Sequence, residues 1–301
     1  MQKIKPCLWM DKTAEKAANL YVSLIDNSRI LHVSRYGKEG FEHHGQPEGT
    51  AMSIELELGG YRLQILNGGP MFKPNPSISL FVQLPDADAV DRMWNGLAEG
   101  GTVMMEMNTY PWSPKYGWLN DRFGVSWQIS VPMGGPAVTS IAPSLMFVGS
   151  QHGKAKAALD LYTALFPHSG IDLAVNYDGS GADPANTLMH ARAHLGNQMI
   201  MAMDSAHDHA FQFTEGVSLS VSCADQAEVD HYWNGLISEG GQESMCGWLK
   251  DRFGVFWQIV PEALGKILSG PDRQGSSRAM QAMFTMKKLD VARLQAAYDS
   301  I

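Results

Sequence analysis

A segment of thirteen residues occurs twice in this chain, and it limits the possible folds more than any other feature. Residues 117–129 read GWLNDRFGVSWQI and residues 247–259 read GWLKDRFGVFWQI, so the two copies differ at only two positions. The shorter match of Trp94–Leu97 with Trp233–Leu236 precedes the long one in both halves. The period of roughly 140 residues is far too long for a solenoid, and it indicates a duplicated domain.

The repeat divides the chain into two modules and a tail. We expect module one at residues 1–133, a linker at 134–142, module two at 143–261 and a helical tail at 262–301. Apolar residues at helical spacing predict two helices in each module, and alternating apolar residues predict strands. Each module therefore has the predicted order β-α-β-β-β-α-β, an α+β fold class, with further strands allowed in its long loops. The predicted strands of module one are 8–10, 52–58, 61–66, 78–84 and 124–131, and helices are predicted in the tail at 278–286 and 290–298.

Composition argues against several classes of partner. The formal net charge is −8 and no long run of Lys or Arg occurs, which is unfavourable for binding nucleic acid or an anionic membrane. No apolar stretch approaches the roughly 20 residues of a membrane-spanning helix, and no apolar signal segment follows Lys3 and Lys5. The three cysteines are widely spaced, which argues against a disulfide framework or a structural zinc site. We therefore expect a cytoplasmic protein without nucleic-acid or membrane partners.

Three segments of the sequence resemble a known family. The opening Pro6–Met10, the repeated thirteen residues and the tail segment Met286–Asp290 are similar to the PhnB-like branch of the vicinal oxygen chelate (glyoxalase-like) superfamily. That branch is also labelled demethylubiquinone-methyltransferase-like. The resemblance implies tandem βαβββ modules whose curved mixed sheets form a cup, with helices outside. It further implies a small-molecule substrate in the cup, usually beside a divalent metal.

The metal positions implied by the resemblance carry neither carboxylate nor imidazole. A divalent cation needs several such ligands, and one neutral Gln is too little charge to hold it. We therefore expect no metal and no cofactor. Gln128 and Gln258 either contact a ligand or hydrogen-bond inside buried strand ends. The metal positions implied by the resemblance fall on three strands of each module. They lie near Lys5 or Pro6 in module one and near Pro143 or Ser144 in module two on the first strands, near Ser79 and Ser218 on the middle strands, and at Gln128 and Gln258 on the last strands.

Other polar groups have alternative readings. One strand face carries alternating polar residues, His190, Arg192 and His194. Together with the nearby His207–His209 they form either a metal cluster or, as we favour, a polar sheet face and a solvated loop. His43–His44 indicate a solvated loop. Module one has Glu55 and Glu57 where module two has Arg192 and His194, so opposite charges either pair across the modules or carry no meaning. Cys246 is more simply a small residue than a reactive thiolate.

The modules differ most just before their repeated segments. Module one has Thr102–Tyr116, which contains Tyr110 and Trp112, whereas module two has only Gln242–Cys246. Aromatic walls with few polar groups are typical of small-molecule pockets, so this segment is either a lid or a loop packed for stability. The candidate ligand-binding residues are Gln128, Gln258, Ser79, Ser218, Tyr110, Trp112, Trp118 and Trp248.

These observations favour a metal-free protein that binds a small organic molecule in a cup between or within its modules. The alternatives are a metal-dependent lyase, isomerase or dioxygenase of the same superfamily and, least favoured, a methyltransferase. A doubly wound methyltransferase needs a Gly-rich turn leading into a helix, but no helical pattern directly follows Gly179–Gly181. Whether the chain is an enzyme stays open. The two modules are expected to pack on each other, and of the assemblies left open a homodimer is favoured.

Overall fold

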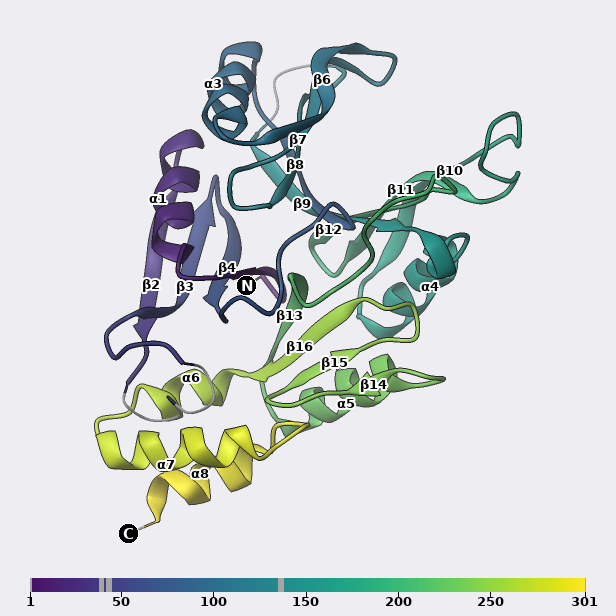
Figure 1. Ribbon diagram of the computed structural model, residues 1–301. Helices are drawn as coiled ribbons and strands as arrows, with labels where there is room; N and C mark the ends of the chain where they lie inside the picture. Colours follow the sequence, from purple (N-terminus) through teal and green to yellow (C-terminus); the bar gives the residue numbers. More distant parts are fainter. Residues whose placement is uncertain (1, 38–40, 42–44, 135–137, 301) are drawn as a thin grey trace.

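The computed structural model describes residues 2–37, 41, 45–134 and 138–300. It contains two eight-stranded mixed sheets with helices, followed by three helices at the C-terminus (Figure 1), which confirms the α+β class. Sheet A has the strand order β14 (Gln242–Glu243), β15 (Trp248–Lys250), β16 (Phe256–Pro261), β13 (Val217–Cys223), β1 (Ile4–Met10), β4 (Tyr61–Asn67), β3 (Ala51–Leu58), β2 (Arg29–Arg35). Sheet B has the order β10 (Gly170–Asn176), β11 (Leu188–Leu195), β12 (Gln198–Asp204), β9 (Ser140–Phe147), β5 (Ile78–Gln83), β8 (Ser126–Val131), β7 (Ser113–Asn120), β6 (Thr102–Tyr110).

Each sheet combines half of module one with half of module two. In sheet A, β1 of module one pairs antiparallel with β13 of module two, and in sheet B, β5 of module one pairs antiparallel with β9 of module two. The modules are therefore packed on each other within one chain, as expected. The boundaries at residues 133, 143 and 261 stay a sequence prediction, because neither sheet corresponds to one module.

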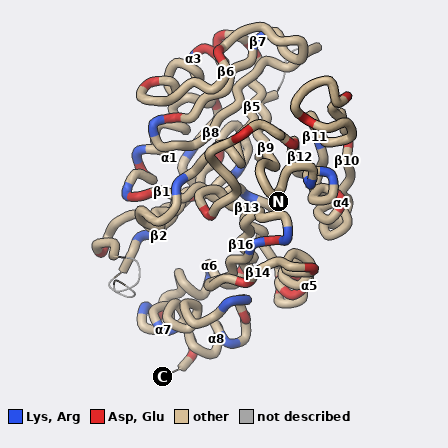
Figure 2. Tube along the Cα trace, turned by 45° about the vertical axis from the view of Figure 1, so that its right-hand side comes forward, with Lys and Arg blue, Asp and Glu red and all other residues tan. Residues whose placement is uncertain are grey.

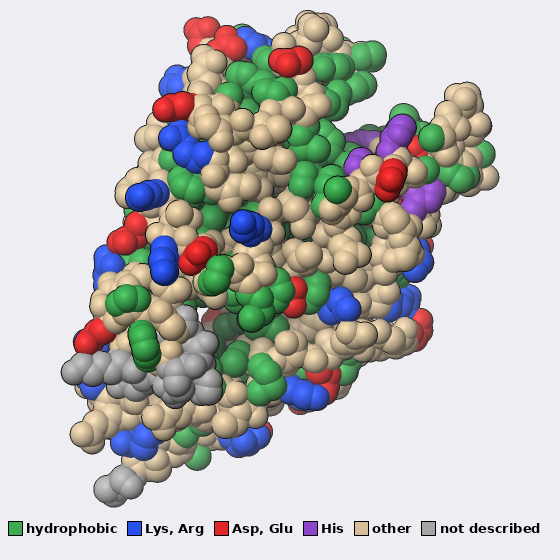
Figure 3. Space-filling model, in the orientation of Figure 1, with side chains coloured by type: hydrophobic (Ala, Val, Ile, Leu, Met, Phe, Trp, Pro, Cys, Tyr) green, Lys and Arg blue, Asp and Glu red, His purple; other side chains and the backbone are tan. Residues whose placement is uncertain are grey.

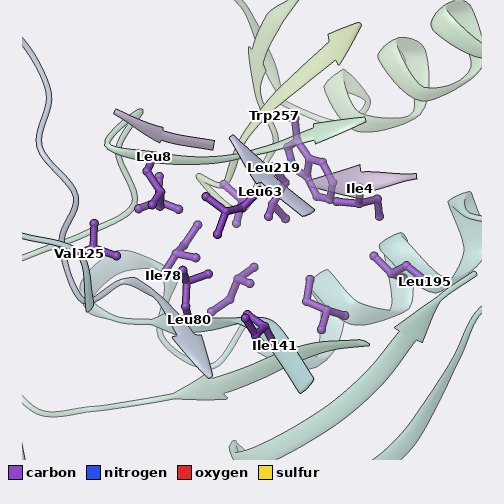
Figure 4. Close-up of a cluster of buried hydrophobic side chains, with 14 of the residues drawn as sticks. Ile4, Leu8, Leu63, Ile78, Leu80, Val125, Ile141, Leu195, Leu219 and Trp257 are labelled. Carbon is purple, nitrogen blue, oxygen red and sulfur yellow. The ribbon is translucent and has the colours of Figure 1, made fainter. Parts of the chain in front are cut away.

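The core lies between the two sheets. Figure 4 shows Leu63, Leu219 and Trp257 of sheet A facing Leu80 and Ile141 of sheet B. The helices that cover the inner faces are α1 (Ala14–Leu24), α3 (Ala87–Ala98), α4 (Ala155–Leu165) and α5 (Gln226–Ile237). Since each large apolar side chain that becomes fully buried contributes about 1.5–3 kcal/mol, this shared core holds the two sheets together.

The repeated thirteen residues form the same buried turn in both sheets. Asp121 accepts hydrogen bonds from the Tyr21 hydroxyl (2.7 Å), the Trp127 indole (2.9 Å) and two backbone N–H groups. Asp251 repeats this arrangement with its own Tyr and Trp. Gly124 and Gly254 have φ of +86° and +89°, the left-handed region that glycine adopts without strain. Because this turn occupies residues 121–125, β8 begins at Ser126 rather than at the expected Gly124.

The C-terminal tail is a separate helical layer. It consists of α6 (Glu262–Leu268), α7 (Arg273–Phe284) and α8 (Val291–Asp299), so the expected helices begin and end differently and α6 was missed. The three helices share a small core of their own. The backbone N–H groups of Cys246 and Gly247 donate to the carbonyls of Met286 and Lys287 (both 2.7 Å), which attaches the tail beside sheet A.

No helix within the described residues is long and apolar enough to span a membrane. Lys and Arg lie interspersed with Asp and Glu along the tube in Figure 2.

Two sequence predictions need correction here. The segment 102–116 is not a loop, because most of it lies in the β6–β7 hairpin, and β2 was missed because its alternation is weak. His43–His44 lie outside the described residues.

Candidate functional site

The outer face of sheet B, which points away from the core, is the first candidate site. In Figure 1 the β6–β7 and β10–β11 hairpins stand at opposite ends of this sheet, and Figure 3 shows the surface hollowed between them with apolar side chains on its wall. We call this region the Gln128 hollow. Its apolar residues form a cluster distinct from the main core: Tyr116, Trp118, Met146 and Val148 are buried, and Phe81, Met105, Tyr110, Met203 and Phe211 pack against them.

Polar side chains of β5, β7 and β8 form two sets of hydrogen bonds on this face of sheet B. The Tyr116 hydroxyl donates to Gln128 Oε1 (2.8 Å), and Gln128 Nε2 donates to Ser79 Oγ (2.7 Å). The Trp118 indole N–H donates to Ser126 Oγ (2.7 Å). Burial raises the pKa of Tyr116, which keeps its hydroxyl protonated as a donor. Both amide atoms of Gln128 therefore bond to protein groups in this structure.

The β6–β7 hairpin folds aromatic rings over Tyr116. Tyr110 and Trp112 stack with ring centroids 5.0 Å apart, and each ring also meets Tyr116 edge-on, at 5.6 Å and 5.8 Å. Trp112 remains 55% exposed, whereas Tyr116 is 4% exposed. We call Tyr110 and Trp112 the aromatic flap. The flap rings contact one another and Tyr116, and neither ring belongs to the main core.

Three methionines give the hollow its other apolar surface, and sequence reasoning missed them. Met199, Met201 and Met203 alternate along β12, so they share one face, and Met203 belongs to the apolar cluster of the hollow. The period of two was visible in the sequence of residues 198–204, where every second residue from 199 is Met. Methionine adapts its shape to irregular contacts, which suits a surface that receives a ligand.

The outer face of sheet A is the equivalent site of the other half, and it is more polar. Gln258 Nε2 donates to Ser218 Oγ (2.9 Å), and the Cys7 thiol faces both side chains. Burial raises the pKa of Cys7 to about 11, so this thiol is protonated and unreactive at neutral pH. Nearby, Lys5 forms an ion pair with Glu55 (3.0 Å).

Trp248 lies on sheet A beside Gln258, and so on a different sheet from its counterpart Trp118. It meets the Trp9 ring edge-on at 5.9 Å on the outer face of sheet A, whereas Trp118, at the matching position, lies in the Gln128 hollow. The eight candidate residues are thus divided between two faces of the molecule. Ser79, Gln128, Trp118, Tyr110 and Trp112 are on sheet B, and Ser218, Gln258 and Trp248 are on sheet A.

The strand positions expected near a metal carry neutral donors. Ser144 pairs in register with Ser79, and Cys7 pairs with Ser218, so Cys7, and not Lys5 or Pro6, is the first-strand residue of sheet A. Within the described residues, no group of three or more His, Cys, Asp or Glu side chains is placed to hold a metal ion. With Gln128 engaged at both ends, the side chains present on sheet B do not fit a divalent cation.

His194 of β11 and His209, which follows β12, have partners within module two. The His194 ring contacts Asp172 Oδ1 at 2.8 Å, and the His209 ring contacts Ser205 Oγ at 2.8 Å. Glu57 pairs with Arg29 (2.8 Å). The idea that Glu55 and Glu57 pair with Arg192 and His194 across the modules is therefore wrong, because the two sets lie on different sheets.

Cys246 is not a candidate nucleophile. Burial raises the pKa of its thiol, and the Sγ contacts the Met283 carbonyl of the tail (3.7 Å). A thiolate would need a cationic neighbour or a helix N-terminus at this position. The residue instead sits where the tail joins sheet A, and the small-residue interpretation is retained.

Comparison with known proteins places this architecture in a family. The model of the 3-demethylubiquinone-9 3-methyltransferase family matches residues 2–130 and 139–260. A PhnB protein from Bacillus cereus is 36% identical over 43% of this chain and 99% of its own, with a TM-score of 0.40. A protein from Staphylococcus aureus is 30% identical over 44% of this chain and 97% of its own, with a TM-score of 0.19.

A longer match shows the fold of the whole chain. Glyoxalase I from Zea mays covers 86% of this chain and 92% of its own, with 9% identity and a TM-score of 0.54. At that identity the likeness concerns the fold alone. No protein of curated function matches the chain. With two family matches in tandem and the glyoxalase-like architecture, the chain belongs to the 3-demethylubiquinone-9 3-methyltransferase (PhnB-like) family.

Proposed function

We propose that this chain binds a small organic molecule in the Gln128 hollow, without a metal. The observation that carries the proposal is the apolar cluster on the outer face of sheet B, which is separate from the core and partly open. Small-molecule sites are typically concave and mostly apolar, with a few placed polar groups. The hydrogen-bonded Ser79, Gln128 and Tyr116 supply such groups at the floor.

The aromatic flap acts as a lid in this proposal. Tyr110 and Trp112 contact the Tyr116 ring, and a ligand enters by replacing these contacts. Module two has no counterpart of this flap, because β14 has only two residues. The two halves are therefore unequal. The sheet B half binds the ligand, and the sheet A half, with its ion pair and attached tail, mainly supports the pairing of the modules.

The proposal is tested with N-phenyl-1-naphthylamine, an uncharged aromatic probe that fluoresces in apolar sites. We expect saturable binding that Trp112→Ala weakens about tenfold to a hundredfold, the range of one aromatic anchor. The matched variant Trp248→Ala, on sheet A, should bind like the unmodified chain. Loss of binding in Trp248→Ala with unchanged binding in Trp112→Ala would assign the ligand to sheet A and reject the proposal.

The metal-dependent alternatives make a different prediction. A lyase, isomerase or dioxygenase of the superfamily type would carry one divalent ion per site through residues that sequence alignment misplaced. Elemental analysis of the purified chain decides between the two classes. We expect less than about one ion per ten chains, and stoichiometric Zn, Mn, Fe or Ni would reject the metal-free proposal.

Methyl transfer, the activity in the family name, has the least support from this fold. Gly179 and Gly181 lie between β10 and β11, which are antiparallel, whereas a cofactor loop of the doubly wound type lies between a parallel strand and a helix. Calorimetry with S-adenosylmethionine at millimolar concentration should detect no binding heat. A homodimer and a cytoplasmic location stay predictions, the first of them measurable by analytical ultracentrifugation.

A further inference from the structure

Arg192 shares its sheet face with the apolar lining of the Gln128 hollow. Across neighbouring strands, Arg192 of β11 pairs with Met201 of β12, Met201 pairs with Ser144 of β9, and Ser144 pairs with Ser79 of β5. Residues paired in register direct their side chains to the same face of a sheet. Figure 3 shows histidine side chains near the β10–β11 side of the hollow, opposite the apolar wall of β6–β7. One wall is therefore apolar, and the other is polar and carries Arg192.

The charge of Arg192 is unbalanced. Its side chain is exposed and forms no ion pair within the described residues. The acidic groups of neighbouring segments are already engaged. Asp172 contacts His194 at 2.8 Å, and Asp183 accepts the Ala206 N–H at 2.7 Å. The guanidinium of Arg192 is therefore free to bind an anion on the face that also carries the apolar lining of the hollow.

His190 lies two residues before Arg192, on the same face of β11. Burial, and then the charge of Arg192, lowers the pKa of His190 below its usual value. Its ring is therefore neutral at neutral pH and can donate one hydrogen bond. The wall thus combines one fixed positive charge with one neutral donor.

The matching position of the other half is neutralised. Glu55 pairs in register with Gln64, and Gln64 with Cys7, which repeats on sheet A the path from Arg192 to Ser144. Glu55 is paired with Lys5 at 3.0 Å. At this matching position the charge is therefore balanced on sheet A by Lys5, whereas Arg192 on sheet B, the half that carries the aromatic flap, has no ion pair among the described residues.

We propose that the Gln128 hollow takes an amphipathic organic anion. Its aromatic body lies against the flap and the methionines of β12, and its carboxylate, or another oxyanion, binds Arg192 with His190 as a further donor. A guanidinium holds an oxyanion through two parallel N–H bonds, and an apolar surrounding strengthens that contact. The inference rests on the proposed function and adds the charge of the ligand to it.

The experiment compares two probes that share one aromatic skeleton. 8-Anilinonaphthalene-1-sulfonate carries a sulfonate, and N-phenyl-1-naphthylamine lacks it. Fluorescence titration measures the Kd of each probe for the full chain, Arg192→Gln, Trp112→Ala and a control, Arg92→Gln. Arg92 is an exposed arginine of α3 that pairs with Asp26, so its replacement removes the same charge far from β11.

We expect Arg192→Gln to weaken the sulfonate probe by about tenfold or more, the usual weight of a hydrogen bond to a charged group. The uncharged probe should change by less than about twofold, and Arg92→Gln should change neither. Equal binding of the sulfonate by Arg192→Gln and the unmodified chain would overturn the anion inference alone, provided that Trp112→Ala still weakens the uncharged probe. Failure of both probes to bind, or to depend on Trp112, would overturn the proposed function together with it.

Discussion

At the residue scale, the carboxylates of Asp121 and Asp251 bind the same four donors in the two halves. Each carboxylate joins the Tyr of the first helix to the Trp of the last strand of its module. This explains why the thirteen repeated residues are so alike, because a change of any partner leaves a buried polar group without its hydrogen bond, at about 1–3 kcal/mol. The repeated residues that stand out in the sequence therefore hold the core, and the candidate site lies where the halves differ.

Replacement of tryptophans by alanine distinguishes the lid from the core. Trp127 is fully buried, so Trp127→Ala should lower the free energy of unfolding by about 3–5 kcal/mol. Trp112 is 55% exposed and contacts only the aromatic residues of its own hairpin in these ring pairs, so Trp112→Ala should cost less than about 1 kcal/mol. Urea unfolding followed by circular dichroism measures both values. A similar loss in both variants would show that the flap belongs to the core.

The pH dependence of stability tests the buried carboxylate. Burial raises the pKa of Asp251 to about 6, despite its four donors. The folded chain therefore holds this proton more tightly than the unfolded chain. The resulting stabilisation is complete below pH about 4 and is lost as the pH rises through about 6, a change of about 2–3 kcal/mol.

Asp251→Asn removes this titration and serves as the comparison. The free energy of unfolding of the unmodified chain, minus that of the variant, should fall between pH 4 and pH 7. Burial also raises the pKa of Asp121, so Asp121→Asn should give a difference of the same sign. A difference that stays constant or grows with pH would contradict the raised pKa.

At the scale of elements, the hairpin β6–β7 and the C-terminal helices account for most of the difference between the halves. The hairpin places aromatic rings over one sheet, and the tail joins the edge of the other. The tail has a small core of its own, centred on Ile267, Leu289 and Leu294. A layer with few buried contacts of its own is expected to open before the sheets that it covers.

Leu294→Ala should release the tail without unfolding the sheets. The side chain is fully buried in the tail core, and its truncation costs about 2–5 kcal/mol, which is more than a small helical layer can lose. Limited proteolysis with mass spectrometry should then show cleavage after residue 261 and an intact fragment before it. The control Leu63→Ala, in the main core, should instead make the whole chain susceptible. Protection of the tail in Leu294→Ala would mean that the tail is part of the main core.

At the scale of the whole molecule, the two modules exchange halves rather than stand side by side. Neither module contains a complete sheet, because β1 and β5 of module one each pair with a strand of module two. A module by itself would expose the edges of both half-sheets, and exposed edges pair with other chains. In the whole chain these edges pair with each other, β1 with β13 and β5 with β9. The fold therefore needs both modules.

Separation of the chain at the linker tests this exchange. Residues 1–134 and 138–301, expressed together, should purify as a 1:1 complex that melts as one unit. Residues 1–134 alone should form a dimer or aggregate, since their β1 and β5 edges are open. Analytical ultracentrifugation measures the assembly of each. A stable monomer of residues 1–134 would show that one module folds without its partner.

The sequence by itself determined the duplication, the α+β class and most strands, because the repeat and the period-two patterns are local properties of the chain. The start of α3 is also set by a local interaction, since the Asp86 carboxylate accepts the Ala89 N–H at 2.8 Å. The β6–β7 hairpin was missed because two prolines and several polar residues between 102 and 116 hide its alternation. In the structure, β6 pairs antiparallel with β7, and this pairing supplies hydrogen-bond partners for the backbone of the segment.

Only the tertiary structure decided which residues meet. Gln128 and Gln258 occupy matching positions in the repeat, yet one lies beneath aromatic rings and the other beside a polar, ion-paired face. The lining of each face comes from both modules, since Tyr116 of module one packs with Met146 of module two. Pairing between strands more than a hundred residues apart is not encoded in any local pattern. It follows from the burial of two half-sheets against one shared core, and that packing is what brings Arg192 and the aromatic flap to the same face of sheet B.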